Sequence, residues 1–175
     1  MEYEVKIRVE GLASIRSRLT ALRIRPEGMT TERDLYLNSP TRDFGRTDEA
    51  LRIRATRDGT TLTYKGPKIG LGEIKAREEL IVPVAGPGDT LEKILVRLGF
   101  TPTALVEKDR ETYRVEGTLV ALDEVKGLGS FVEIEAPPGL GEAEAVALIR
   151  RVREILGITG ENTTLSYLEM ILATR

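Results

Sequence analysis

The sequence predicts an α+β protein in which antiparallel strands close into a β-barrel flanked by helices. Three observations carry this prediction. Apolar and polar residues alternate in one segment after another, which is the pattern of strands with one buried face. Short turns separate many of these segments, so neighbouring strands would pair antiparallel. Few helical segments interrupt them, and closing the sheet would remove its exposed edges.

The N-terminal half is expected to alternate between strands and loops around one helix. The first strand covers the opening ten residues, and an amphipathic helix follows from Gly11 to Leu22. Further strands are expected at Glu32–Asn38, Ala50–Arg57, Thr60–Lys65 and Glu73–Val82. The Asp58-Gly59 turn joins the middle two as a hairpin, and Pro83 ends the last one. Loops are expected at Thr41–Asp48 and Gly66–Gly72.

The C-terminal half is expected to hold a strand meander between helices. A helix from about Asp89 to Leu98 would stop at Gly99. The meander strands are Ala104–Val115, Thr118–Val125 and Ser130–Ala136. A helix over Leu140–Leu156 and a short last helix starting near Thr163 complete the chain. Without repeats or linkers, residues 1–175 are expected to form a single domain.

Composition excludes several classes of functional site. The chain is 41% hydrophobic and 31% charged, carries a net charge of −2, and has no cysteine or histidine. Disulfides, thiolate zinc sites and imidazole-based catalysis are therefore excluded, and a metal would need the oxygen ligands that suit Mg²⁺, Mn²⁺ or Ca²⁺. The net charge disfavours binding of nucleic acid over the whole surface. Because no apolar run reaches the ~18 residues of a membrane span, a cytoplasmic protein is expected.

The charged faces of the expected strands carry the functional prediction. Charges recur two residues apart, which places them on one face of each strand. The acidic members are Glu2, Glu4, Asp123, Glu133 and Glu135, and the basic ones are Lys6, Arg52, Arg54, Lys65, Lys108 and Arg110. If these faces share an interior, burial is costly unless the charges are paired or bind ions. Such an interior suits a polyanion with divalent cations; the alternative for any one strand is a solvated face or an ion-pair ladder.

The opening Glu2-x-Glu4-x-Lys6 resembles the ExExK signature of the CYTH superfamily, the triphosphate tunnel metalloenzymes. The resemblance extends along the chain through Leu51–Arg54, Thr63–Pro67, Arg77–Glu79, Lys108–Arg110, Leu122–Val125 and Gly129–Glu135. The segments Asp34–Tyr36, Pro40–Phe44 and Thr47–Arg54 look most like the class IV adenylate cyclase branch. ExExK alone is a weak signal, but the ordered set is specific.

The resemblance implies one CYTH-like domain over residues 1–175, with an eight-stranded antiparallel tunnel that binds a triphosphate with Mg²⁺ or Mn²⁺. The implied metal ligands are Glu2, Glu4, Asp123, Glu133 and Glu135. The implied triphosphate-binding residues are Lys6, Arg52, Arg54, Lys65, Lys75, Arg77, Lys108 and Arg110, with Lys6, Arg54 and Lys108 as candidate catalytic residues. The roles of Lys75 and Arg77 depend on the register of their strand, where they share a face with Glu79. A shift of one residue would place Glu78 on that face in place of Glu79.

The resemblance leaves the reaction open. A class IV adenylate cyclase, the preferred interpretation, joins the ribose 3′-hydroxyl of ATP to the α-phosphorus and releases pyrophosphate. A thiamine triphosphatase or tripolyphosphatase, the alternative, directs water at a terminal phosphorus. Without histidine, the proton would pass to a metal-bound oxygen or to a lysine such as Lys6. A non-catalytic nucleotide or polyphosphate binder is a further alternative; no nucleic-acid or membrane partner is expected, and a homodimer is compatible with the resemblance.

Overall fold

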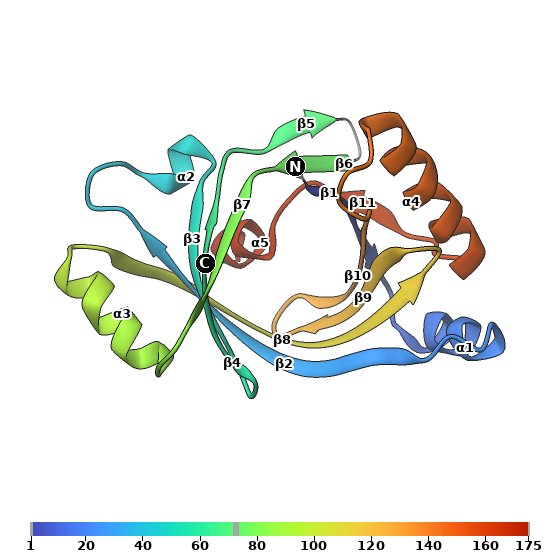
Figure 1. The fold of residues 1–175 in the computed structure, drawn as a ribbon, viewed down its shortest axis with the longest axis horizontal. Coiled ribbons are helices and arrows are strands. Elements are labelled where there is room, and N and C mark those ends of the chain that lie inside the picture. The colour runs from blue at the N-terminus through green and yellow to red at the C-terminus, as the bar shows by residue number, and fades with distance from the viewer. Residues whose placement is uncertain (1, 72–73, 175) are drawn as a thin grey trace. The chain divides into compact units, whose positions relative to one another are not determined.

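The computed structural model of the chain describes residues 2–71 and 74–174, with only the backbone described at residues 2, 70, 71 and 74–76. The strands are β1 (Glu2–Val9), β2 (Pro26–Asn38), β3 (Ala50–Thr56), β4 (Gly59–Lys65), β5 (Ile69–Leu71), β6 (Ile74–Arg77), β7 (Glu79–Val84), β8 (Thr101–Val115), β9 (Thr118–Val125), β10 (Gly129–Glu135) and β11 (Glu161–Thr163) (Figure 1). The helices are α1 (Ala13–Ala21), α2 (Phe44–Thr47), α3 (Gly88–Arg97), α4 (Glu142–Leu156) and α5 (Tyr167–Ala173). In the part of the chain that is described, no helix combines the length and the apolar character needed to cross a membrane.

A large antiparallel sheet with a few helices confirms the predicted α+β class. Its strands follow the order β5-β6-β1-β10-β9-β8-β2-β3-β4-β7, and β11 pairs with β1. Among the described residues no strand pairing joins β5 to β7, so the structure shows an open sheet of eleven strands instead of the predicted closed eight-stranded barrel.

The sheet also differs from the prediction at Glu78. The single strand expected over Glu73–Val82 is divided there into β6 and β7, and Glu73 itself lies outside the described residues. The Glu78 carbonyl accepts a hydrogen bond from the Gly66 amide, one residue beyond the Lys65–Glu79 pair of the β4–β7 register. Strand β7 pairs with β4, and Pro83 fits within it because proline is tolerated in edge strands.

The chain divides into two compact units, each built from separate segments. Unit 1 comprises Met1–Thr30, Ile69–Ala76 and Asp109–Thr164. Unit 2 comprises Thr31–Lys68, Arg77–Lys108 and Leu165–Arg175. Strands β2 and β8 each contribute residues to both units. The single domain over residues 1–175 stays a prediction.

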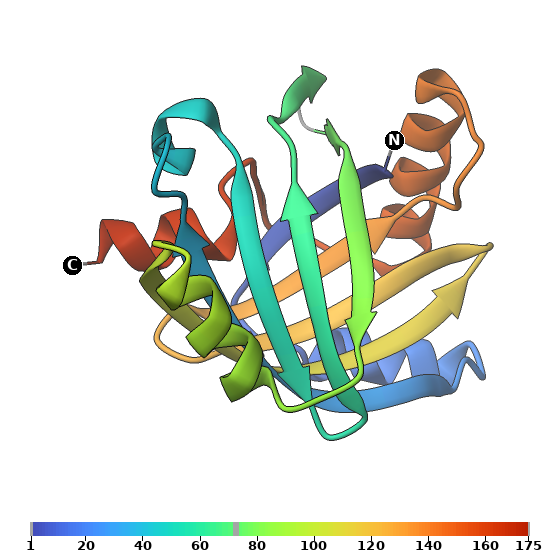
Figure 2. The same ribbon diagram turned by 60° about the vertical axis from the view of Figure 1, so that its left-hand side comes forward.

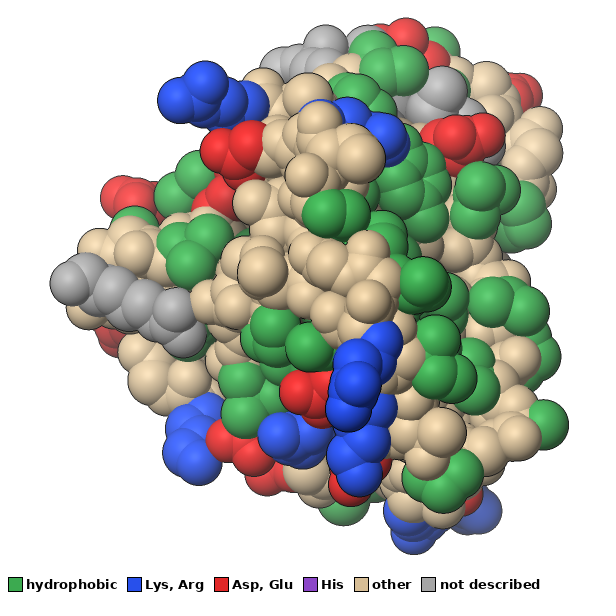
Figure 3. Space-filling view, turned by 90° about the vertical axis from the view of Figure 1, so that its left-hand side faces the viewer, with side chains coloured by type: hydrophobic (Ala, Val, Ile, Leu, Met, Phe, Trp, Pro, Cys, Tyr) green, Lys and Arg blue, Asp and Glu red, His purple; other side chains and the backbone are tan. Residues whose placement is uncertain are grey.

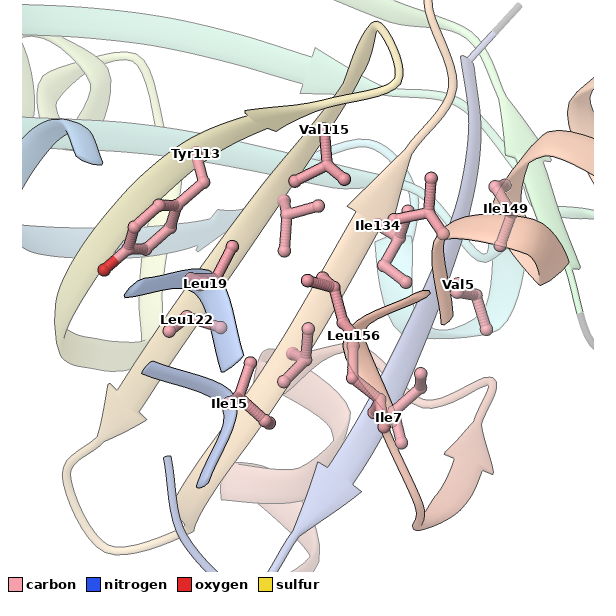
Figure 4. Packing of buried hydrophobic residues seen from close by; sticks show 14 of the residues in the cluster. Val5, Ile7, Ile15, Leu19, Tyr113, Val115, Leu122, Ile134, Ile149 and Leu156 are labelled. Atoms are coloured by element: carbon pink, nitrogen blue, oxygen red, sulfur yellow. The ribbon is translucent and has the colours of Figure 1, made fainter. Parts of the chain in front are cut away.

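The core of unit 1 lies between one face of its strands and the helices α1 and α4. Val5 and Ile7 of β1 are buried, as their alternation predicts, and Val132 and Ile134 of β10 join them. Figure 4 shows side chains of both helices in this cluster, among them Ile15 and Leu19 from α1 and Ile149 and Leu156 from α4. Since the apolar face of each strand packs against helices, the charged residues of β1 and β10 occupy the opposite face.

The core of unit 2 is smaller. Leu35, Leu37 and Ile53 are buried, and Leu91 and Leu95 of α3 pack against them. Figure 2 shows β3, β4 and β7 side by side, with α3 near β3. Other apolar side chains reach the surface, including Leu80, Ile81 and Val82 of β7, and the face drawn in Figure 3 also carries hydrophobic side chains among charged ones.

Candidate functional site

The charged face of unit 1 is buried, and its charges are paired. Lys6 is 4% exposed and lies opposite Glu133 in the β1–β10 register, with its Nζ 2.9 Å from Glu133 Oε1. Arg110 of β8 donates two hydrogen bonds to the fully buried Asp123 of β9, at 2.7 and 2.5 Å. Arg110 also contacts Glu133. Lys6, Glu133, Arg110 and Asp123 thus form one connected group, the unit 1 cluster.

Lys6 is held in its charged form. Burial by itself would lower the pKa of this amine, but attraction from Glu133 and Glu4, together with the hydrogen bond to Glu133, outweighs it and raises the pKa. An amine that keeps its proton is a poor general base and a good partner for an anion. The pKa of Lys6 therefore favours phosphate binding over proton abstraction.

Three of the predicted metal ligands, Glu4, Glu133 and Glu135, lie on the paired strands β1 and β10. Glu4 lies opposite Glu135 in the register, and Glu133 is two residues from Glu135. Their carboxylate oxygens are the donor type that Mg²⁺ and Mn²⁺ prefer. Among the described residues, however, no group of three or more acidic side chains is placed to hold a metal ion. A metal ion bound at Glu133 would compete with Lys6 and Arg110 for its carboxylate. The side chain of Glu2 lies outside the described residues.

A second buried cluster lies in unit 2, where β2, β3 and β8 bring three cations to two carboxylates. Arg54 donates two hydrogen bonds to Asp34, both 2.7 Å, and its Nη2 lies 2.9 Å from Glu32 Oε2. Arg52 Nη1 lies 3.6 Å from Asp34, and Lys108 Nζ is 3.1 Å from Glu32. Strand register sets this arrangement, because Asp34 lies opposite Arg54. These five residues form the unit 2 cluster.

Asp34 is buried among the cations of the unit 2 cluster. It is 1% exposed, and burial alone would raise its pKa. The hydrogen bonds from Arg54 and the charges of Arg52 and Lys108 outweigh burial and lower the pKa to about 2. Asp34 is therefore ionised throughout the physiological pH range.

The remaining predicted phosphate-binding residues lie outside these two clusters. Lys65 pairs with Glu79, its partner in the β4–β7 register. Arg77 donates to the backbone carbonyls of Gly66 and Asp48, so it anchors the loop after β4. The side chain of Lys75 falls outside the described residues.

The last helix, α5, brings Tyr167 to the unit 2 cluster, a residue that is not among the predicted site residues. The Lys108 ammonium lies 5.0 Å from the centre of the Tyr167 ring, within the range of a cation–π contact. Two residues after Tyr167, Glu169 accepts hydrogen bonds from Lys68 at 2.8 and 2.9 Å. Lys68 also contacts Asp48, so this lysine fastens the helix to a loop of the same unit.

Glu32 and Asp34 are not among the predicted site residues, although both lie in the expected strand Glu32–Asn38. A signal for both was present, because Glu32, Asp34 and Tyr36 alternate on one face of a strand. Pairing that strand with the Arg52–Arg54 strand would have placed Asp34 opposite Arg54. The register that decides this pairing was not fixed by the local pattern.

Comparison with known proteins supports the predicted family. The family model described as the CYTH domain matches residues 1–167. A Methanocaldococcus jannaschii protein named as a putative adenylate cyclase is 36% identical over 135 residues, which are 77% of this chain and 76% of that protein.

Solved structures share the fold over almost the whole chain. The PH1819 protein of Pyrococcus horikoshii is 36% identical and covers 100% of both chains with a TM-score of 0.85. A Hippeastrum protein, named as a putative adenylyl cyclase with a dominant triphosphatase activity, is 22% identical with a TM-score of 0.74, covering 100% of this chain and 97% of its own. On the match of the family model along nearly all of its length, this chain belongs to the CYTH domain family.

Proposed function

We propose that this chain is an enzyme that acts on a small triphosphate, most like a class IV adenylate cyclase that converts ATP into cyclic AMP and pyrophosphate. The observation that carries the proposal is an incomplete pairing in the unit 2 cluster. Arg52 Nε is buried and has no hydrogen-bond acceptor among the described residues, and three cations there face two carboxylates. A buried N–H without an acceptor costs about 1–3 kcal/mol, and a phosphate oxygen would supply the acceptor.

The residues of the two clusters would bind phosphate oxygens, a metal ion, or both. Arg52, Arg54 and Lys108 would bind phosphate oxygens and neutralise charge that develops during transfer. In unit 1, the raised pKa of Lys6 keeps it cationic for the same purpose. Glu4, Glu133 and Glu135, with Asp123 and Glu2, are the proposed ligands of Mg²⁺ or Mn²⁺, in line with the divalent-metal dependence of the family. When bound, the metal would supply electrostatic stabilisation of the phosphate charge.

Hydrolysis of a triphosphate is the second candidate. The Hippeastrum relative, whose name gives it a dominant triphosphatase activity, favours it, and thiamine triphosphate or tripolyphosphate would then be the substrate. A non-catalytic binder of nucleotide or polyphosphate is a third candidate. The cation-rich unit 2 cluster suits any of the three, because all bind the same phosphate chemistry. We further propose a cytoplasmic location without nucleic-acid or membrane partners, and assembly as a homodimer.

Product analysis distinguishes these candidates. With ATP and Mn²⁺, we expect cyclic AMP and pyrophosphate in equal amounts, separated by ion-exchange chromatography. ADP with phosphate, or turnover of thiamine triphosphate or tripolyphosphate alone, would establish a hydrolase instead. Tight binding of ATP, thiamine triphosphate and tripolyphosphate without turnover would identify a non-catalytic binder. The absence of both binding and turnover would refute the proposal.

Arg54→Ala is expected to weaken triphosphate binding roughly 10- to 150-fold, because it removes charge-assisted hydrogen bonds worth about 1.5–3 kcal/mol. Isothermal titration calorimetry with tripolyphosphate measures the affinity. Arg57→Ala is the matched control, since Arg57 lies beyond the end of the same strand and its side chain is 79% exposed. Equal affinity in the Arg54 and Arg57 variants would remove Arg54 from the site.

A further inference from the structure

Arg54 is held by Asp34 in a fixed orientation. Its Nε and Nη2 atoms each donate to a different oxygen of the Asp34 carboxylate, both at 2.7 Å. This two-pronged geometry restrains the plane of the guanidinium as well as its position. Asp34 is nearly fully buried, at 1% exposure, while Arg54 keeps 17% of its side chain exposed. Of the two side chains, Arg54 is therefore the one that solvent or a ligand can reach, and Asp34 is covered.

Glu32 contacts the same arginine in a different way. Its Oε2 atom lies 2.9 Å from Arg54 Nη2 and 3.1 Å from Lys108 Nζ. This oxygen is nevertheless buried without a partner that meets hydrogen-bond geometry. The Glu32 carboxylate is thus close enough to attract both cations, but it accepts no directional hydrogen bond at Oε2. Of the two carboxylates, Asp34 restrains the orientation of Arg54 and Glu32 chiefly balances charge.

We infer that Asp34 is a positioning residue that presents Arg54 to the phosphates of the substrate. The inference rests on the proposed function for the identity of the ligand, a polyphosphate group. A guanidinium that is already oriented loses less conformational freedom on binding, so affinity rises although the nearby carboxylate is itself negative. Two of the three guanidinium nitrogens of Arg54 donate to Asp34, and a guanidinium carries five N–H groups in all.

This role predicts a change in affinity opposite in sign to that expected from charge alone. Asp34→Asn removes one negative charge next to the cations, so a purely electrostatic effect would tighten the binding of a polyanion. Loss of positioning would weaken it, because an asparagine presents one oxygen and one N–H₂ group and cannot accept both bonds from Arg54. The direction of the change therefore decides between the two explanations.

The binding experiment compares Asp34→Asn with Glu32→Gln by calorimetry with tripolyphosphate at constant salt and Mn²⁺. Both variants remove the same charge from the same strand. We expect about tenfold weaker binding for Asp34→Asn, the size of a lost charge-assisted hydrogen bond, and affinity at or above wild type for Glu32→Gln. Wild-type or tighter binding in Asp34→Asn overturns the inference, as does equal weakening in both variants.

A second readout does not depend on a ligand. In ¹⁵N NMR spectra, the Nε–H signal of Arg54, assigned by its loss in Arg54→Lys, should show slow guanidinium rotation in the wild type and fast rotation in Asp34→Asn. Unchanged rotation overturns the inference even if binding changes. If the wild-type protein binds neither tripolyphosphate nor ATP, the proposed function fails while the rotation still decides the positioning role.

Arg54→Lys provides the test if Asp34→Asn does not fold. The lysine keeps the positive charge but lacks the planar fork, so the same weakening of tripolyphosphate binding is expected without a change in net charge. Wild-type affinity in Arg54→Lys would overturn the inference. In the Arg54→Lys background, Asp34→Asn should cause no further loss, as expected of two residues acting through one contact.

Discussion

Glu133→Gln is expected to lower metal-dependent triphosphate turnover by roughly 10²–10³-fold, the scale of losing one electrostatic contact to a transition state. Glu133 joins the two cations of the unit 1 cluster, since Lys6 lies 2.9 Å from it and Arg110 contacts its other oxygen. It is also a proposed metal ligand. Glutamine keeps the shape of the side chain but removes the charge that both roles need. Initial rates at several Mn²⁺ concentrations measure the effect.

The matched control for this prediction is Glu124→Gln. Glu124 lies on the neighbouring strand β9, is exposed, and accepts hydrogen bonds from Ser130 at 3.0 Å. Its substitution should leave turnover within about twofold, because an exposed polar contact contributes little. Both variants should give the same circular dichroism spectrum as the wild type. Unchanged kinetics in Glu133→Gln would refute the metal assignment of this residue.

Asp123→Asn is expected to lower the free energy of unfolding by about 3 kcal/mol, because it breaks a buried ion pair and leaves a charge without its partner. Asp123 is fully buried, and both of its oxygens accept hydrogen bonds from Arg110, which is 13% exposed. Arg110 keeps its contact with Glu133 in the variant, which places the loss at the lower end of the range for such pairs. The midpoint of thermal unfolding should fall by about 6–12 °C.

Asp58→Asn is the control for the stability prediction. Asp58 lies 3.5 Å from Arg57 in a pair whose side chains are 76% and 79% exposed. Pairs of this kind contribute about 0–1 kcal/mol, so urea unfolding should be nearly unchanged. A loss in Asp123→Asn no larger than in this control would show that the Arg110 fork does not stabilise the fold.

Strand faces and long helices could be predicted because they depend on local periodicity. Alternation placed Val5 and Ile7 in the core and Lys6 on the opposite face, and the structure confirms both. The helix expected over Leu140–Leu156 is α4, which begins two residues later, at Glu142. In each case the signal lies within a few residues of the element that it predicts.

Short elements and strand limits were less predictable. The last helix begins at Tyr167, after the capping residue Ser166, whose hydroxyl accepts from the Glu169 amide while Glu169 bonds back to it. The sequence contains this Ser-x-x-Glu capping box, which indicates a helix start at Tyr167 and not near Thr163. The division of the strand at Glu78 into β6 and β7 had no comparable local signal in the sequence.

By itself, the sequence determined the family, the α+β class and the alternation that commits charged residues to one face of each strand. It did so because those properties depend on residue order and short-range periodicity. Only the tertiary structure decided which charges meet. Lys6 meets Glu133 through the β1–β10 register, and Arg54 meets Asp34 through the β2–β3 register. Register depends on pairing between distant segments, and burial then fixes the protonation of the residues that it brings together.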